Sequence, residues 1–583
     1  MKRNKQLRNG PSLFARWWFG PLVALCCAQS VATAQESIQL TDVSDRTGIQ
    51  FVHTDGSDGR YFVIESFSAG LALLDYDLDG DLDIYFLNGA AIDRPAGDDA
   101  PTNALYRNDG DWKFTDVTRQ AGVGDTGYGM GVACGDFNND GAPDIYVNNY
   151  GSNVLYRNNA DGTFVDVTGS AQVGNGHKVG AGVSYLDMDA DGDLDLYIGN
   201  YCQFDPAGHK VHMHKGLPAY PSVSSAQPEP DTLFRNNADD TFTDVSDESG
   251  IRSVAGRSMG VVAFDYDQDG DSDIAVANDT MENHLFQNDG HGHFTEVGLL
   301  AGFAYDYKGR AQGSMGLEVA DFDGDGLQDV YVTSFSDEFS TLYRNLGGGL
   351  FEDATLRFGG AQATLPHVTW GVVAEDFDNN GTRDLLIAAG DIDDKRHLRG
   401  GASPVTGFKI PNILLTNEGP GKLRPLQRWG SGSLARESSR GMVAGDLDSD
   451  GRIDAVVLNG RAAPTIMKNE TKLAAYVQIR LVGTHSNRDG VGASVTVEQG
   501  EFSQTRQVLC GHSYQSDSGR TQHFGLPSST TLASAKIVWP TGRTQLMKEI
   551  PISRGITVLE IDAQEYSPLD TNIDEKYRTK NLR

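Results

Sequence analysis

A nine-residue, aspartate-rich motif recurs seven times along the chain. Its rule is D-x-[DN]-x-[DN]-G-x-x-D, and the first copy, "DYDLDGDLD", begins at Asp75. Carboxylates this close together repel one another by roughly a kcal/mol per pair near a protein surface. A cation between them would neutralise that repulsion, so the motif predicts a metal-binding loop. The candidate ligands at motif positions 1, 3, 5 and 9 are Asp75, Asp77, Asp79 and Asp83; Asp136, Asn138, Asp140 and Asp144; Asp187, Asp189, Asp191 and Asp195; Asp265, Asp267, Asp269 and Asp273; Asp321, Asp323, Asp325 and Asp329; Asp376, Asp378, Asn380 and Asp384; Asp446, Asp448, Asp450 and Asp454.

The motif differs from an EF-hand. An EF-hand loop needs a bidentate Glu at position 12 and a following helix, whereas position 12 here is apolar in every copy and lies in an expected strand. Hard oxygen ligands in a flexible loop suit Ca²⁺ better than Mg²⁺. The sequence therefore predicts up to seven Ca²⁺ ions, each also bound by a backbone carbonyl near position 7. Binding should be weaker where Asn138 and Asn380 replace carboxylates. The alternative is a set of acidic turns without an ion.

Further markers repeat with the motif. A glycine stands five residues before the first aspartate in all seven copies. An "LYRN"-like segment follows each loop, and an "FTDV"-like segment follows each of the first five loops. Short runs of aromatic and β-branched residues alternate with Asn, Asp and Gly, which is typical of strands and tight turns. Four strands per unit and seven units predict an all-β fold, a seven-bladed β-propeller over residues 35–470. The repeated glycine is expected on the crowded inner strand of each blade.

The repeat order also predicts how the ring closes. The first unit begins with "LTDV" at residue 40, and the last unit ends with "IMKN" at residue 466. Each of these segments lacks the rest of its unit unless the two pair with each other. We therefore expect residues near 466 to form a sheet with residues near 40.

The N-terminus is typical of an export signal. Residues 1–34 combine a basic start, an apolar run of about a dozen residues and an A-x-A cleavage site. The apolar run is too short to span a bilayer, and no other segment is predicted to do so. The protein is thus expected to be secreted; the alternative, a lipid anchor at Cys26 or Cys27, fits poorly because Leu25 precedes them. After cleavage three cysteines remain, which are too few for a disulfide framework.

A second, smaller β domain is predicted over residues 471–562. Its expected strands include "AYVQIRLV", "ASVTVEQG", "TRQVLCG", "AKIVWP" and "GITVLEID", separated by Gly, Ser, Asn or Pro. These segments favour a small sandwich-like domain beside the propeller. Residues 563–583 are polar and charged and are predicted to be a tail. An insertion over 201–230 separates the third and fourth repeats.

These motifs resemble known families. The aspartate repeats resemble the FG-GAP/VCBS calcium-binding repeats of integrin-α-type propellers, and "GHSYQSDSGRTQHFGL" with "AKIVWPTGRTQ" resembles an ASPIC/UnbV domain. Repeats followed by ASPIC/UnbV are similar to the cartilage acidic protein family. The resemblance implies secreted, calcium-binding proteins. Relatives often carry a "YCGP"-like stretch before "PDxLYRN", which this chain lacks, so a disulfide at Cys202 does not carry over.

Composition narrows the function. The formal charge of the 583 residues is −32, so nucleic acid is not an expected partner, and cations or basic partners are favoured. The leading hypothesis is an extracellular or cell-surface adhesion scaffold that binds a protein or glycan through its loops, chiefly the 201–230 insertion. The alternative is an enzyme acting on extracellular polymer. Its metal would be held by His209, His212 and His214 in that insertion, or a carboxylate pair from two blades would supply acid and base.

Overall fold

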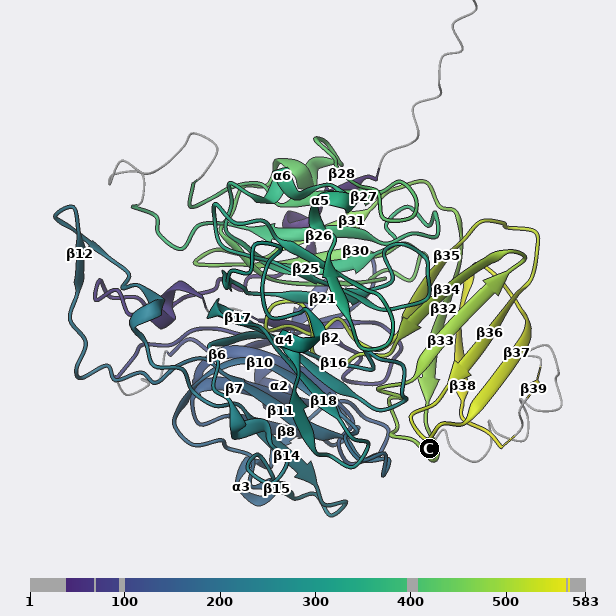
Figure 1. The fold of residues 1–583 in the computed structure, drawn as a ribbon, viewed down its shortest axis with the longest axis horizontal. Coiled ribbons are helices and arrows are strands. Elements are labelled where there is room, and N and C mark those ends of the chain that lie inside the picture. The colour runs from purple at the N-terminus through teal and green to yellow at the C-terminus, as the bar shows by residue number, and fades with distance from the viewer. Residues whose placement is uncertain (1–37, 68–69, 94–99, 396–406, 563–564, 567–583) are drawn as a thin grey trace, which may run out of the picture. The chain divides into compact units, whose positions relative to one another are not determined.

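Short antiparallel strands joined by tight turns make up most of the protein (Figure 1). The computed structural model describes residues 38–67, 70–93, 100–395, 407–562 and 565–566. The predicted signal peptide and most of the predicted tail lie outside the described residues. None of the helices in the described part of the chain has the length and apolar character needed to cross a membrane.

The fifth repeat shows how one unit folds. Strands β21 (Leu317–Ala320), β22 (Asp329–Val332), β23 (Thr341–Asn345) and β24 (Phe351–Asp353) pair antiparallel in chain order. The aspartate loop joins β21 to β22, and the "LYRN" and "FEDA" segments form the β23–β24 hairpin, as the sequence predicted. Three of the four strands are almost wholly buried, so their apolar runs form a core between neighbouring sheets.

The other repeats have the same strand order. Their strands are β2 (Leu71–Leu74), β3 (Asp83–Phe86), β4 (Ala104–Asn108) and β5 (Phe114–Asp116); β6 (Tyr128–Gly135), β7 (Asp144–Gly151), β8 (Val154–Asn158) and β9 (Phe164–Asp166); β10 (Lys178–Leu186), β11 (Asp195–Asn200), β14 (Thr232–Asn236) and β15 (Phe242–Asp244); β16 (Ser258–Phe264), β17 (Asp273–Met281), β18 (His284–Asn288) and β19 (Phe294–Glu296); β25 (Thr369–Glu375), β26 (Asp384–Ala389), β27 (Ile413–Asn417) and β28 (Leu423–Pro425); β29 (Ser439–Gly445), β30 (Asp454–Asn459) and β31 (Thr465–Asn469).

Single helical turns follow several of the outer strands. They are α1 (Ser44–Thr47), α2 (Thr118–Ala121), α3 (Thr168–Ala171), α4 (Gly298–Ala301), α5 (Thr355–Phe358), α6 (Ala361–Thr364), η1 (Val63–Ser66), η3 (Ile251–Ser253) and η5 (Ser431–Leu434). The fold is therefore an all-β propeller, and its strand pairings are consistent with seven blades.

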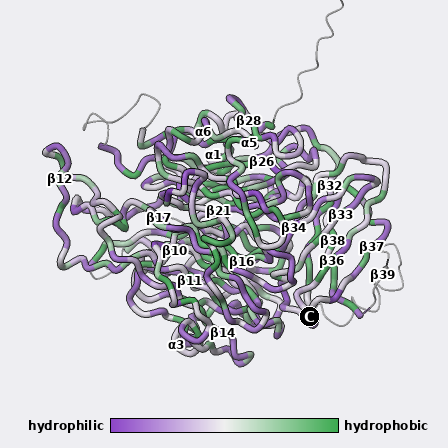
Figure 2. The backbone as a smooth tube through the Cα atoms, in the orientation of Figure 1, coloured by the Kyte–Doolittle hydropathy of each residue, from purple (hydrophilic) through white to green (hydrophobic). Residues whose placement is uncertain are grey.

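The predicted ring closure is confirmed. Strand β1 (Leu40–Asp42) pairs antiparallel with β31, with Leu40 opposite Asn469 and Asp42 opposite Met467. This makes β1 the fourth strand of the last sheet. Pairing with β1 covers the edge of β31, so the last sheet has four strands and β1 is its outermost strand. Figure 2 shows the apolar strands in green and the more polar connections in purple.

The repeated glycine lies where neighbouring inner strands approach most closely. A Cβ atom on Gly131 would come within 2.1 Å of the Ala181 carbonyl oxygen, and one on Gly371 within 2.7 Å of the Arg440 carbonyl oxygen. These distances are too short for any side chain to fit. The prediction of a crowded inner strand is therefore confirmed, and substitution at these positions requires the blades to separate.

The C-terminal region forms two further sheets. One contains β35 (Gln522–Leu526), β32 (Ala475–Val482) and β38 (Arg554–Leu559), with β32 and β38 parallel. The other contains β34 (Phe502–Gln507), β33 (Ser494–Gln499), β36 (Ala533–Val538), β37 (Thr544–Ile550) and the short strand β39 (Glu565–Tyr566). Their facing apolar side chains share one core that includes Val477, Val495 and Trp539.

Residues 508–520 leave this domain and enter the propeller, and we call them the plug. The sequence predicted a strand over 505–511, but β34 ends at Gln507 because the chain turns into the ring. Within the plug, Ser513 exchanges two backbone hydrogen bonds with Leu317 (2.8 and 2.9 Å), and Asp517 bonds the backbone of Leu71 and Leu73. The plug thus binds inner strands of two repeats through main-chain groups.

The sequence placed the 201–230 insertion between the third and fourth repeats, but it lies within the third repeat, between β11 and β14. It forms a hairpin of β12 (His212–His214) and β13 (Leu217–Ala219), followed by the helical turn η2 (Val223–Ser225). An isolated bridge between Cys202 and Pro228 closes its base. The hairpin projects from the strands of the propeller (Figure 1).

Candidate metal centres

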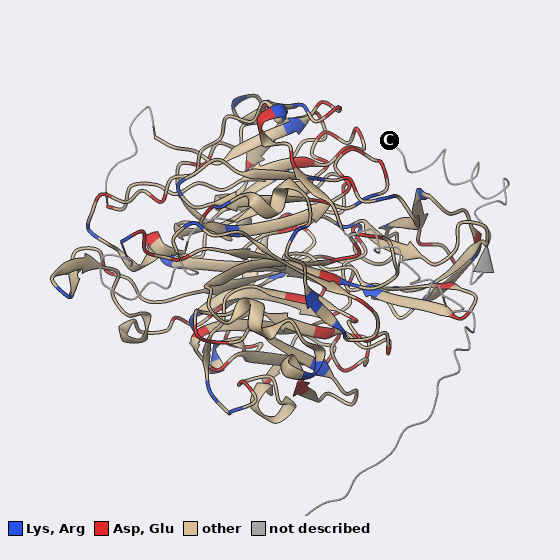
Figure 3. Ribbon diagram, turned by 90° about the horizontal axis from the view of Figure 1, so that it is seen from above, with Lys and Arg blue, Asp and Glu red and all other residues tan. Residues whose placement is uncertain are grey.

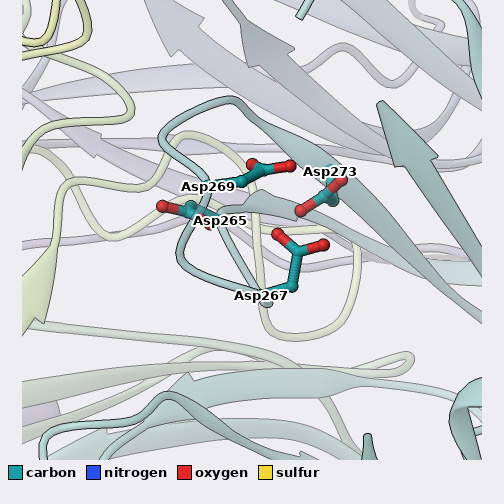
Figure 4. Close-up of side chains that lie close together, drawn as sticks. All are labelled: Asp265, Asp267, Asp269 and Asp273. Atoms are coloured by element: carbon teal, nitrogen blue, oxygen red, sulfur yellow. The ribbon is translucent and has the colours of Figure 1, made fainter. Parts of the chain in front are cut away.

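The fourth aspartate loop gathers four carboxylates. One oxygen of each of Asp265, Asp267, Asp269 and Asp273 lies within 4.8 Å of the others, and the side chains converge in Figure 4. Three of these residues lie in the turn between β16 and β17, and Asp273 begins β17. Four convergent carboxylate oxygens are a donor set that suits a hard divalent cation.

The loop backbone is built in the same way in every repeat. The glycine at position 6 has a φ between 85° and 100° in all seven loops, and its N–H donates to the position-1 aspartate. The residue at position 4 is also left-handed in every copy, for example Leu78 and Gln268. The sequence predicted the turn at the glycine but gave no signal for position 4, which accepts Leu, Asn, Ala, Gln, Gly or Ser.

The position-9 aspartate has a structural task as well as a candidate ligand role. In the first repeat, Asp83 Oδ1 accepts the Asn108 backbone N–H (2.7 Å) and Asp83 Oδ2 accepts the Tyr76 N–H (3.1 Å). The same two bonds occur in all seven repeats. This carboxylate therefore ties the loop to the third strand. Each oxygen retains a second lone pair that could bind a cation.

Other loops form smaller clusters of carboxylates. They are Asp75 with Asp77 and Asp83; Asp187 with Asp189 and Asp195; Asp321 with Asp323 and Asp325; and Asp376 with Asp378 and Asp384. These four clusters do not include the predicted ligands Asp79, Asp191 and Asp329. In the second loop, Asn138 donates to Asp140 Oδ2 (3.0 Å), which orders these two side chains without an ion.

The position-3 aspartate supplies the strongest local indication of a cation. In five loops one oxygen of this residue is buried and has no hydrogen-bond partner: Asp77, Asp189, Asp267, Asp323 and Asp448. An unpaired buried carboxylate oxygen is costly. A cation at the centre of each loop would satisfy it, so the residues present fit the predicted group.

Burial also opposes ionisation of the loop carboxylates. Burial raises the pKa of Asp83 to about 8, and burial together with neighbouring carboxylates raises the pKa of Asp187 to about 7. Burial and, after it, the negative charge of Asp489 raise the pKa of Asp136 to about 7. A bound cation would reverse this balance because it favours the charged form.

In two loops the third residue of the "LYRN"-like segment is a basic residue that pairs with a candidate ligand. Arg344 contacts Asp323 and lies 2.7 Å from Asp325 Oδ2 in the fifth loop. Lys468 contacts Asp448 in the seventh loop, where the Trp112 indole N–H also donates to Asp448 (2.8 Å). Both basic residues occupy the third position of the "LYRN"-like segment. They neutralise part of the loop charge, so these loops differ from the fourth, where the equivalent residue is Gln287.

The asparagine of the "LYRN"-like segment is a functional residue that sequence reasoning did not assign. In the second repeat, Asn158 Nδ2 donates to the Tyr76 carbonyl (2.8 Å) of the preceding blade, and to the Pro143 carbonyl (3.1 Å) of its own loop. All seven repeats make the bond to the preceding blade. Because this asparagine recurs in all seven repeats, the sequence could have indicated that it has a structural role.

The histidines of the insertion occupy different surroundings. His209 Nε2 lies 2.7 Å from the Arg60 carbonyl oxygen, and its ring packs on Phe62 with centroids 4.5 Å apart. His212 and His214 lie on β12 and are exposed. Of the cysteines, Cys134, Cys202 and Cys510 are buried and unbridged.

Comparison with known families accounts for both parts of the chain. Residues 75–147, 136–198, 222–276, 265–332 and 321–387 match the family described as FG-GAP-like repeat, and residues 483–565 match ASPIC and UnbV. The chain is an FG-GAP repeat protein with a C-terminal ASPIC and UnbV domain.

This FG-GAP repeat protein has homologues among the cartilage acidic proteins. It is 26% identical to cartilage acidic protein 1 of Xenopus tropicalis, over 63% of the chain and 53% of the relative. It is 30% identical to cartilage acidic protein 1 of Mus musculus, over 66% of the chain and 54% of the relative. The chain thus spans about half the length of these relatives.

Among solved structures, one match is an Agrocybe aegerita lectin that recognises non-reducing terminal N-acetylglucosamine. It shares 17% identity and a TM-score of 0.38, over 69% of this chain and 94% of the lectin.

Proposed function

We propose that this protein is a secreted, calcium-stabilised propeller that serves as an extracellular or cell-surface binding scaffold for a protein or glycan ligand. The buried, unpartnered oxygen of the position-3 aspartate in five loops is the observation that carries the calcium part of the proposal. FG-GAP-like repeats and the propeller fold support the scaffold part. The aspartate loops would be structural, because an ion that binds only the folded chain stabilises it by mass action.

The proposal assigns the calcium ligands within each loop. Positions 1, 3 and 5 would bind the ion with side-chain oxygens, and position 9 would hold the loop against the third strand while sharing an oxygen with the ion. When bound, Ca²⁺ would supply the positive charge that the converging carboxylates require. The chain's own contribution is the left-handed backbone at positions 4 and 6, which turns these side chains inward.

Calcium titration with thermal unfolding tests this assignment. We expect the melting temperature to fall on chelation and to recover with Ca²⁺, and we expect mass spectrometry of the native protein to detect bound ions. Asp267→Asn should remove one ion from the count, because it neutralises a ligand of the fourth loop. Asp247→Asn is the matched control, since Asp247 is an exposed acid of the third repeat outside every loop. An unchanged melting temperature in excess chelator would disprove the calcium scaffold.

Export and ligand binding need separate measurements. Secretion predicts a mature chain that begins at Gln35, which mass spectrometry of the exported protein can show; a lipid-modified N-terminal cysteine would contradict it. The scaffold role predicts binding in a screen of glycans and surface proteins, and loss of that binding when residues 209–222 of the insertion are replaced by a short Gly-Ser turn. Binding that survives this replacement would show that the ligand contacts a part of the protein outside the insertion.

A further inference from the structure

A cavity of about 540 Å³ lies at the end of the propeller opposite the aspartate loops. Its lining includes Met259, Met315 and Trp370, each of which directly precedes a repeated glycine near the start of an inner strand. The other ends of those strands lead into the aspartate loops. The cavity and the candidate metal centres are therefore separate sites.

The floor of the cavity is apolar and well supported. Trp370 is fully buried, its ring meets Tyr514 of the plug edge to face with centroids 5.2 Å apart, and the Arg440 guanidinium lies 4.1 Å from its centroid. Phe67 and Phe335 add further aromatic surface to the lining. Packing on both sides fixes the buried indole, so the stem of a ligand would lie against the half-buried Phe335, Ile392 and Val223 beside this rigid base.

Two carboxylates from neighbouring repeats stand at one side of this floor. A Cβ atom on Gly313 would lie 3.3 Å from Asp279 Oδ1 and 3.7 Å from Glu338 Oε2, so both carboxylates converge on this glycine. Asp279 Oδ2 accepts the Tyr201 hydroxyl (2.7 Å), and Glu338 Oε2 accepts the Gly313 N–H (2.9 Å). These bonds fix the direction of both side chains at the cavity wall.

The charged groups that line the cavity are mainly acidic. Asp391 and Asp393 join Asp279 and Glu338, and the facing basic or titratable groups are Lys215, His212 and His214 of the insertion. Arg257 and Arg310 lie behind the two carboxylates and offset part of their charge. Even so, burial and, to a smaller extent, the charge of Glu338 raise the pKa of Asp279 to about 6. The pair lacks enough positive charge to compensate its burial.

We propose that this cavity receives a lysine or arginine side chain of a protein partner. Such a side chain combines a long apolar stem with a terminal cation, which matches an apolar floor beside two carboxylates. The strongly acidic composition of the chain would also attract a basic partner. A neutral glycan would stack on the aromatic groups and leave the carboxylates uncompensated. This inference rests on the proposed scaffold function and names the chemistry that the scaffold recognises.

Short peptides can test the inference on the full-length, calcium-loaded protein. The probes are acetyl-Ala-Ala-Lys-Ala-Ala-amide, its arginine counterpart, and a norleucine counterpart that keeps the stem but lacks the charge. We expect calorimetry at low salt to detect the lysine or arginine peptide and to show at least tenfold weaker binding of the norleucine peptide. Glu338→Gln and Asp279→Asn should each weaken lysine-peptide binding about tenfold, and Ile392→Trp should block it by filling the cavity.

Matched controls separate a local effect from a general electrostatic one. Glu248→Gln and Asp111→Asn remove exposed acids elsewhere and should leave the affinity unchanged. Equal binding of the norleucine peptide, equal losses in the control variants, or no binding of either basic peptide would each overturn the inference. N-acetylglucosamine oligomers that bind wild type but not Ile392→Trp would also overturn it, yet would leave the scaffold proposal intact. The scaffold proposal itself fails only if the ligand screen finds no partner of any class.

Discussion

At the scale of single residues, one asparagine per repeat holds neighbouring blades together. Its side chain bonds a carbonyl of the preceding blade, while its backbone N–H is held by the position-9 aspartate of its own loop. In the first repeat the same bond joins Asn108 to Leu447, across the point where the ring closes. The side chain is buried in every repeat, so water cannot replace the lost partner.

Asn158→Ala should therefore destabilise the protein by about 2–4 kcal/mol, because it leaves the buried Tyr76 carbonyl and the half-buried Pro143 carbonyl without this donor. Urea unfolding followed by fluorescence measures the change. The neighbouring Asn159 is exposed and bonds only within its own hairpin. Asn159→Ala should cost less than about 1 kcal/mol. Equal losses in the two variants would show that the contact between blades is not the cause.

A buried histidine makes ring closure sensitive to acid. His53 Nδ1 accepts the Arg461 backbone N–H (3.2 Å), and the backbone N–H of His53 donates to the Ala462 carbonyl (3.0 Å). Burial first, and then the positive charges of Arg440 and Arg461, lower the pKa of His53 from 6.5 to about 3. The folded protein therefore holds a neutral ring that the unfolded chain would protonate below pH 6.5.

This difference has a definite sign. Because the folded pKa is the lower one, the stabilisation is complete above pH 6.5 and declines as pH falls toward 3, by about 1.4 kcal/mol per pH unit for one group. His53→Asn keeps an acceptor and cannot be protonated. Its unfolding free energy, measured from pH 7 to 4.5, should fall less steeply than that of wild type. His293 is exposed, so the unfolding free energy of His293→Asn should change with pH as that of wild type does. If His53→Asn also had the wild-type slope, His53 would not be the source of the acid sensitivity.

At the scale of elements, the aspartate loops share a backbone but differ in charge. The motif could predict the turn and its glycine, since both depend on residues close together in the sequence. The motif could not predict that Arg344 and Lys468 contact the aspartates of their loops. The third residue of the "LYRN"-like segment varies and is Arg, Gln, Thr or Lys in different repeats. Sequence reasoning ranked the loops by their Asn substitutions, whereas the structure adds these basic neighbours.

Arg344→Gln should raise the calcium affinity of the fifth loop by about tenfold, because it removes a positive charge that contacts Asp323 and Asp325. The fourth loop already has glutamine at this position. Calorimetric calcium titration measures the change. Arg357→Gln is the control in the same blade, since Arg357 pairs with Glu352 (2.7 Å), which is not a candidate ligand. A fifth loop that binds calcium more weakly in Arg344→Gln would mean that the arginine orders the site instead of competing for it.

At the scale of the whole molecule, the sequence could predict the propeller and its closure, because seven local patterns repeat in register. The same logic could not predict the plug. Residues 508–520 contain Gly, Ser, Gln and Asp, which is the composition of an ordinary surface loop. Their partners lie far away in sequence: Ser513 with Leu317 and Asp517 with Leu71. Only the packed structure brings these residues together.

The plug carries a buried ion pair into the ring. Asp517 and Arg520 are joined by two contacts of 2.7 Å, and Asp517 Oδ2 also accepts the Cys134 backbone N–H (2.8 Å) of β6. Although burial alone would raise the pKa of Asp517, Arg520 lowers it below its usual range. Figure 3 shows charged residues on many of the connections between strands. A pair inside the ring therefore links the stability of the propeller to that of the C-terminal domain.

Asp517→Asn should destabilise the protein by about 3–5 kcal/mol, because it leaves Arg520 buried without a counter-ion. The double variant Asp517→Asn, Arg520→Met should recover part of this loss, since no charge then remains buried. Asp562→Asn is the matched control, because its pair with Arg543 is exposed (3.0 Å) and should contribute less than about 1 kcal/mol. Calorimetry should record one unfolding transition for wild type and a lower one for Asp517→Asn. If the propeller transition stays in place while a smaller C-terminal transition moves alone, the plug does not couple the two parts.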